Sequence, residues 1–281
     1  ELEPALAAFR QALAQTSALY DADPRNNDYL FELGQAEFWV GYVAWQRGDF
    51  DGAYQAMQRY MEYSRELSQR SPDNDGYWLE LSYAYGNLGS VALAQGRPQA
   101  ALAGFRDSLA LAESLLAKRP RDYELALNVA DTHSWVGTTL LELGRLAEAR
   151  DAFAQAAAVM QPFHQQARDQ RASYDYCRLL ILQAEADISR GDVGGARRAL
   201  EESLIVYAKL LEIDPTNTTW LYNALTAETH LLSLVPPGQW TARERAALER
   251  IESRLTESWS GDSSDKDYIR LRFRVRNLHD V

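Results

Sequence analysis

The chain of 281 residues has 40 acidic and 29 basic residues, a net charge of −11, and 46% hydrophobic residues. This balance is typical of a folded globular protein and argues against nucleic acid as a general partner, because phosphate backbones bind basic surfaces. No apolar run approaches the roughly 18 residues of a membrane-spanning helix, and a single cysteine, Cys177, excludes an intrachain disulfide.

A glycine recurs along the chain at a nearly constant interval. Gly48, Gly96, Gly144 and Gly191 are separated by 48, 48 and 47 residues, and each is followed by aspartate or arginine. An alanine stands five residues after each glycine, and four residues further on comes a large apolar residue: Met57, Phe105, Phe153 or Leu200. Such a period predicts a repeat architecture built from helix pairs.

The repeated glycine is predicted to form the turn between two antiparallel helices, because a tight turn needs a residue that tolerates positive φ. Seven residues earlier lies Gly41, whose copies are Gly89, Gly137 and Ala184. Gly41 is expected inside the first helix of its pair, facing Ala53 near the start of the second. Small residues at both places let the backbones approach closely, which offsets the cost of roughly 1 kcal/mol for a glycine in a helix.

In chain order, we predict a lone second helix at 2–21 and then five helix pairs: 27–46 with 50–70, 74–95 with 97–118, 122–143 with 145–166, 170–190 with 193–212, and 217–234 with 241–258. The array spans 1–258, with a partial unit at 1–24 and units at 25–72, 73–120, 121–168, 169–215 and 216–258. A C-terminal capping helix occupies 259–281, near 264–279. The predicted fold class is all-α, a right-handed superhelical solenoid of antiparallel helix pairs.

The two ends of the array carry separate predictions. We expect the sequence, which opens on Glu1, to be a piece of a longer chain, so that the first helix has an exposed stripe of Leu2, Leu6, Phe9 and Leu13. This stripe is expected to pack on another copy, by self-association, or on upstream sequence. At the other end, Ile269–Arg276 alternates apolar and basic residues, a pattern typical of a strand. A helix is favoured, because a single strand would have no partner, and its arginines are expected to pair with acidic second helices.

The stretch Leu88–Phe105, LGSVALAQGRPQAALAGF, with the proline that follows the second helix, resembles the tetratricopeptide repeat (TPR). The family unit has 34 residues, so about seven residues are added to each helix here. Long repeats of this kind are also similar to the C-terminal portions of bacterial multidomain signalling proteins, such as membrane-anchored Ser/Thr kinases. The resemblance implies a docking or sensor region that binds a protein or peptide partner in a concave groove.

In this family, the exposed stripe of the first helices lines the groove. Helical steps from the buried glycine, together with an adjoining stripe, select the candidate binding residues Gln35, Phe38, Trp39, Tyr42, Trp45, Tyr83, Asn87, Ser90, Asp131, Ser134, Trp135 and Thr138. Asn87 matches a family asparagine that often contacts a bound peptide backbone. The bulky rings of the first unit beside Gly86, Ser90, Ser134 and Thr138 predict a recess. The alternative, that neighbouring helices close the gap and the rings fill the core, stays open.

The sequence offers no catalytic or metal-binding constellation, so we predict neither an enzyme nor a cofactor. The histidines His133, His164, His230 and His279 are too scattered for a ligand pair. Cys177 and His133 are interpreted as structural residues, and the Ser71–Gly76 segment as a helix cap formed by Asp73 or Asn74 rather than a calcium loop. A small-molecule sensor and a structural or oligomerisation spacer remain alternative functions. The compartment stays open: periplasmic if the fragment belongs to a membrane-anchored receptor, otherwise cytoplasmic, with no insertion into a membrane.

Overall fold

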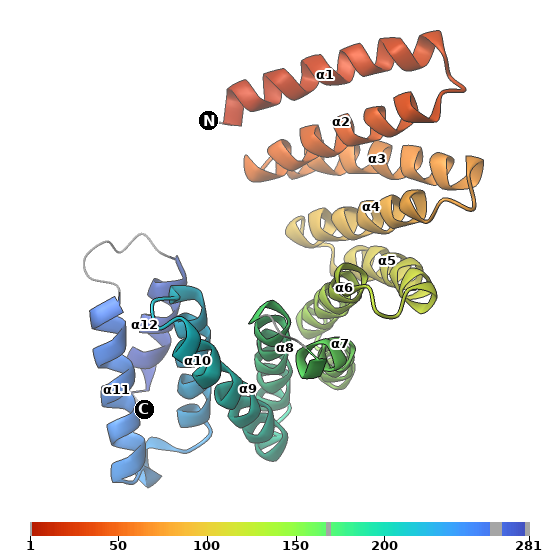
Figure 1. Ribbon diagram of the computed structural model, residues 1–281. Helices are drawn as coiled ribbons and strands as arrows, with labels where there is room; N and C mark the ends of the chain where they lie inside the picture. The colour runs from red at the N-terminus through yellow and green to blue at the C-terminus, as the bar shows by residue number, and fades with distance from the viewer. Residues whose placement is uncertain (1, 167–169, 259–265, 279–281) are drawn as a thin grey trace. The chain divides into compact units, whose positions relative to one another are not determined.

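A computed structural model describes residues 2–166, 170–258 and 266–278 (Figure 1). The regular structure of these residues is entirely helical, with twelve α-helices: α1 (Leu2–Ala22), α2 (Asn27–Gln46), α3 (Phe50–Arg70), α4 (Asp75–Ala94), α5 (Pro98–Lys118), α6 (Tyr123–Glu142), α7 (Leu146–Gln166), α8 (Gln170–Ser189), α9 (Val193–Ile213), α10 (Thr218–Ser233), α11 (Ala242–Ser258) and α12 (Lys266–Asn277). One short 3₁₀ helix, η1 (Pro237–Gln239), joins α10 to α11. Within each of the two units defined below, helices adjacent in sequence pack as antiparallel pairs, which confirms the all-α fold.

Two compact units divide the chain, Glu1–Arg145 with α1 to α6 and Leu146–Val281 with α7 to α12. The observed helix ends agree with the predicted ones within about two residues. The short 3₁₀ helix, which lies between the predicted helices 217–234 and 241–258, was not predicted. No helix in the described part of the chain has a stretch long and apolar enough to cross a membrane. The predicted unit boundaries stay a prediction.

The glycine turns have the conformation that the repeat predicts. Gly48, Gly96, Gly144 and Gly191 have φ values of +77°, +69°, +70° and +76°. At the first turn, the backbone N–H of Asp49 donates to the carbonyl of Ala44 at 2.9 Å, which ends α2. The Asp49 carboxylate then accepts a hydrogen bond from the Gly52 N–H at 3.0 Å and caps α3. An aspartate after the glycine therefore begins the second helix as soon as the first one ends.

The glycine inside the first helix, Gly41 or Gly89 in the first two pairs, sits where two helices touch. A Cβ built on Gly89 would lie 3.0 Å from two ring carbons of Phe105 and 3.1 Å from the carbonyl oxygen of Ala101. At Gly41 the same position would meet Met57 at 3.0 Å and the Ala53 carbonyl oxygen at 3.3 Å. The paired helices thus approach too closely for a methyl group, as the small-residue pattern predicts.

The apolar stripe of α1 is not exposed, and this prediction was wrong. Leu6 is only 3% exposed and packs with Val40, Val43 and Ala56, while Phe9 and Leu13 are partly buried against the same cluster. Phe9 also stacks on Trp39, with ring centroids 5.4 Å apart. The stripe faces α2 because a second helix packs on the first helix of the next unit. The surface on which self-association was based is therefore largely covered, and Leu2 alone of the four residues stays exposed.

The C-terminal segment with alternating residues is the helix α12, as predicted. Leu271 and Val275 are buried and pack with Leu225 and Ile251 of α10 and α11. Ile269 and Phe273 point away from this cluster and are 47% and 65% exposed. In a strand, Ile269 and Phe273 would share one face with Leu271 and Val275, so burial of every fourth residue alone fits a helix and not a strand.

We predict opposite effects for two substitutions within α4. Gly89→Ala should lower the free energy of unfolding by about 1–3 kcal/mol, because the Phe105 ring and the Ala101 carbonyl would have to move. Gly86→Ala is the matched control: its Cβ would meet Ser108 Oγ at an ordinary 3.4 Å, so the gain in helix propensity, roughly 0.5–1 kcal/mol, should remain. Urea denaturation of both variants measures the difference. A Gly89→Ala variant as stable as the wild type would refute the close-contact account.

Candidate functional site

The N-terminal unit contains a recess of about 310 Å³ bounded by helices α2 to α6. Fourteen residues line it: Gln35, Phe38, Tyr60, Glu80, Tyr83, Gly86, Asn87, Ser90, Phe105, Ser108, Asn128, Asp131, Thr132 and Trp135. The first helices of three successive repeats contribute most of these side chains, and the second helices α3 and α5 contribute Tyr60, Phe105 and Ser108. The recess therefore depends on the regular stacking of helix pairs.

Aromatic rings form the walls of the recess. The Phe105 and Trp135 rings are stacked with centroids 5.7 Å apart, and Phe38 and Tyr60 are 5.6 Å apart. Phe105 is fully buried, whereas Trp135 is 45% exposed and Tyr83 is 39% exposed. Exposed rings supported by buried ones provide rigid apolar contact area for a partner.

Small residues leave the space between these rings open. Gly86 has no side chain, and the small side chain of Ser90 donates its hydroxyl hydrogen bond to the Gly86 carbonyl at 3.1 Å. Beneath them, the buried Ser82 hydroxyl donates to the Ser108 carbonyl at 3.0 Å. The hydroxyl groups of Ser82 and Ser90 are thus satisfied by hydrogen bonds within the protein.

A carboxylate is held at one side of the recess. Glu80 Oε2 accepts hydrogen bonds from Gln35 Nε2 at 2.8 Å and from the Tyr60 hydroxyl at 2.6 Å. Burial, together with the negative charge of Glu80 and this hydrogen bond, raises the pKa of Tyr60 well above its usual range. The phenol therefore stays protonated and acts as a donor that fixes the carboxylate.

The sequence supplies an independent indication of the repeat family. Residues 81–122, which include α5 and most of α4, match the family model described as Tetratricopeptide repeat. The chain is a TPR-like repeat protein. TPR-like arrays are superhelical stacks whose extended surfaces generally bind other proteins, and they are typically not catalytic.

Solved structures show the same fold at low sequence identity. BtubC (BKLC) from P. vanneervenii has a TM-score of 0.67 and 16% identity, with 95% of this chain and 96% of that chain covered. The apo form of RapI has a TM-score of 0.62 and 14% identity, covering 100% and 93%. A putative kinesin light chain from Podosopora anserina with TPR-like repeats has a TM-score of 0.59 and 14% identity, covering 80% and 95%. No curated protein sequence matches the chain.

Seven of the candidate binding residues line the recess: Gln35, Phe38, Tyr83, Asn87, Ser90, Asp131 and Trp135. Five others do not line it. Trp39 stacks on Phe9 of α1, Tyr42 lies near Trp39 with ring centroids 5.9 Å apart, and Trp45 packs against the core cluster around Met57. Ser134 is buried, with its hydroxyl bonded to the Ala130 carbonyl, and Thr138 lies outside the lining. The recess is therefore lined by only part of the candidate set.

Seven lining residues were not among the candidate binding residues: Tyr60, Glu80, Gly86, Phe105, Ser108, Asn128 and Thr132. Three of them come from second helices, which the family resemblance did not select. Glu80 and Asn128 occupy equivalent positions 48 residues apart, three residues before Tyr83 and Asp131. One further helical step toward the N-terminus along the groove stripe would have found both.

Other candidates from the sequence have structural roles. Cys177 is fully buried, and burial raises the pKa of its thiol, which disfavours the reactive thiolate. His133 lies 3.3 Å from a Glu113 carboxylate oxygen, and burial lowers its pKa although Glu113 opposes the shift. Asn74, one of the two predicted caps, accepts a hydrogen bond from the Gly76 N–H at 3.0 Å. No group of three potential metal ligands occurs among the described residues.

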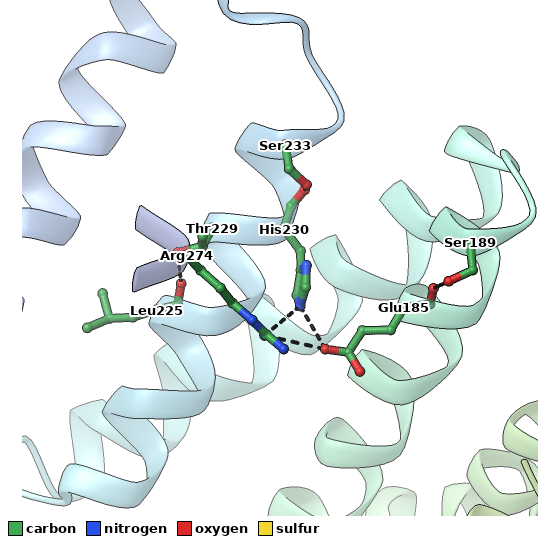
Figure 2. A network of polar contacts seen from close by, with 7 residues as sticks. All are labelled: Glu185, Ser189, Leu225, Thr229, His230, Ser233 and Arg274. Carbon is green, nitrogen blue, oxygen red and sulfur yellow. Dashed lines mark hydrogen bonds and ion pairs between the residues drawn. The ribbon is translucent and has the colours of Figure 1, made fainter. Parts of the chain in front are cut away.

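The C-terminal unit has a polar network that joins three helices (Figure 2). Glu185 Oε1 on α8 lies 2.9 Å from His230 Nε2 on α10 and 3.5 Å from Arg274 Nη1 on α12. Arg274 also lies 3.2 Å from His230 Nε2. The expectation that these arginines pair with acidic second helices was wrong for Arg274, because its carboxylate partner stands on the first helix of a pair. The contact links α12 to α8 and α10.

Glu185 makes the stability of this unit pH-dependent. Burial by itself would raise the pKa of Glu185, but the hydrogen bond and charge of His230 and the Arg274 guanidinium outweigh it and lower the pKa below its ordinary value. The ionised carboxylate therefore stabilises the fold above pH about 4.3, and this contribution is lost as the pH falls through the lowered pKa.

We predict that Glu185→Gln lowers the melting temperature at pH 7 by about 2–4 °C, corresponding to a loss on the order of 1 kcal/mol. The difference from the wild type should shrink as the pH falls below about 4, because the wild-type carboxyl is then protonated too. Glu201→Gln is the control, since its partner Arg197 is 3.9 Å away and both side chains are exposed. Calorimetry at both pH values measures the effect, and an unchanged difference at low pH would contradict it.

Proposed function

We propose that the protein is a protein–protein interaction module that binds a peptide or partner segment in the recess of its N-terminal unit. The observation that carries this proposal is a recess with exposed aromatic walls and a floor of Gly86 and Ser90, bounded by the first helices of three successive repeats. Aromatic anchors beside a space of this kind are where binding energy concentrates in interfaces. The TPR-like fold supports the proposal, because extended stacks of helix pairs commonly present binding surfaces.

The finer part of the proposal is that the array is a docking or sensor region of a larger bacterial signalling protein. It rests on the likeness of long TPR-like repeats to the C-terminal portions of such proteins. In that role, the recess would hold a segment of another protein or of the parent chain. Occupancy would then be the signal that reaches the attached effector.

A small-molecule sensor is the second candidate function. The recess volume of about 310 Å³ is at the lower end of the range for small-molecule pockets, roughly 300–1,000 Å³. A ligand of this size would be nearly enclosed by the rings, whereas a peptide would insert one side chain and lie across the groove. The spacer alternative makes no use of the recess.

We predict that Ser90→Trp abolishes partner binding and leaves the fold intact. Ser90 is half-buried, and the equivalent position of the preceding unit already carries the ring of Tyr42, so the backbone accommodates an aromatic side chain there. Peptides selected from a random phage-displayed library on the wild-type protein provide the probe. Their affinity, measured by fluorescence anisotropy, should fall at least tenfold, while the melting temperature changes by less than about 3 °C.

Ala110→Trp on the exposed side of α5 is the matched control, and it should bind the selected peptides like the wild type. Equal binding by the Ser90→Trp variant would overturn the proposal. A collapse of the melting temperature would instead mean that neighbouring helices close over the gap and that the rings belong to the core. Selection of no peptide, together with saturable binding of a small molecule that Ser90→Trp blocks, would favour the sensor.

A further inference from the structure

We infer that the recess recognises a positively charged side chain, lysine or arginine, presented by the partner segment. This inference rests on the proposed function and adds the chemistry of the occupant. Two carboxylates, Glu80 and Asp131, are among the fourteen residues that line the recess, and none of these fourteen is lysine, arginine or histidine. An anionic group entering the recess would meet like charge, so the charge of the lining favours a cation.

The Glu80 carboxylate can accept a hydrogen bond from a third donor. Both of its hydrogen bonds, from Gln35 and Tyr60, reach the same oxygen, Oε2. These two donors hold the carboxylate in one orientation, and Oε1 remains to accept a hydrogen bond from a ligand. A cation that donates to a preoriented carboxylate forms a charge-assisted hydrogen bond, which is about twice as strong as a neutral one.

The aromatic walls suit a cation as well. Tyr83 and Trp135 keep large exposed ring areas beside the carboxylates, and a guanidinium or ammonium group is attracted to such ring faces. Burial and the negative charges of Glu80, Glu124 and Asp122 raise the pKa of Tyr83. The same charges that disfavour the Tyr83 phenolate would stabilise a cation at this edge of the recess. The aliphatic stem of lysine or arginine could cover the rings while its head reaches Glu80.

Asn128 indicates that the cation is carried by a peptide. Its side-chain nitrogen, Nδ2, is buried without a hydrogen-bond partner, although Asn128 lines the recess. A buried amide donor without an acceptor costs roughly 1–3 kcal/mol, which a carbonyl oxygen of the occupant would recover. Asn128 stands one repeat after Glu80 at the equivalent position. A peptide supplies both groups together, a cationic side chain for Glu80 and a backbone carbonyl for Asn128.

A neutral apolar side chain is a poorer occupant. It would fill the space between Phe38, Tyr83 and Trp135, but it would remove water from the Glu80 carboxylate and give no hydrogen bond in return. Burying an ionised group without compensation is costly. The lining therefore discriminates between a cation and a neutral group of the same shape, and this difference can be measured.

Isosteric peptides test the inference directly. Four pools of acetylated, amidated heptapeptides are identical mixtures except at the central residue, which is arginine, citrulline, lysine or acetyl-lysine. Citrulline has nearly the shape of arginine without its charge, and acetyl-lysine removes the charge of lysine. Each pool is passed over the immobilised full chain, and the retained peptides are quantified by mass spectrometry. The arginine and lysine pools should be retained at least tenfold more than their neutral counterparts.

Glu80→Gln distinguishes the recess from general attraction to an acidic protein. The variant keeps an oxygen that can accept from Gln35 and Tyr60 and removes the charge. It should retain a wild-type melting temperature and lose the preference for the charged pools. Glu62→Gln is the matched control, because it removes the same charge from an exposed position on α3, and it should keep the preference. Higher salt should weaken retention of the charged pools by the wild type, and the neutral pools should be unaffected.

The outcomes separate this inference from the proposed function. Equal retention of charged and neutral pools would overturn the inference, and so would a preference for the charged pools that survives in Glu80→Gln. In either case, the proposed function would still stand if Ser90→Trp abolishes peptide binding. Failure of every pool to bind would overturn the inference as well. Free butylguanidinium should displace the arginine pool only at concentrations at least a hundredfold higher than an arginine heptapeptide. Equal potency would show that a free amine or guanidine, rather than a peptide, satisfies the site.

Discussion

The close contact between the two helices of each repeat is the constraint on which the rest of the structure depends. Gly89 and Phe105 show it best, because the glycine removes a methyl group at the point where the ring presses against the backbone. The contact recurs 48 residues apart, at Gly41 in the pair α2–α3 and at Gly89 in the pair α4–α5. First helices of successive repeats then present equivalent positions side by side, and a binding surface can be composed from residues 48 positions apart.

Much of this architecture could be predicted from the sequence, because its signals are local. Gly48 and its copies mark turns through their conformational freedom, and Asp49 marks the following cap, so helix ends were placed closely. The exposure of α1 could not be derived in the same way. Leu6 and Phe9 were predicted to be exposed because α1 was interpreted as the second helix of an incomplete unit, but the same stripe also faces the following helix α2. A single helix has one apolar face, and the sequence does not say which neighbour covers it.

The candidate site was predictable in its location and only partly in its membership. Tyr83, Asn87 and Ser90 followed from the exposed stripe of one helix. Tyr60 and Phe105 enter the recess from second helices, whose side chains reach the groove only where a small residue of the first helix leaves a gap. Which gap stays open depends on the rotamers of neighbouring rings, and sequence spacing does not determine rotamers. The hydrogen bonds that orient Glu80 belong to the same class of information, since they join three different helices.

Phe105 is part of both the helix-pair contact and the wall of the recess, and this double role limits which substitutions the protein can accept there. Its ring fills the contact with Gly89 inside the helix pair, and it also supports the Trp135 ring in the wall of the recess. A substitution that alters the ring would therefore shift core packing and the shape of the recess together. Gln35, Tyr83 and Asn87 line the recess without filling a helix-pair contact of this kind. Divergence of specificity among relatives should proceed through such positions, whereas Phe105 would tie the evolution of binding to the maintenance of the fold.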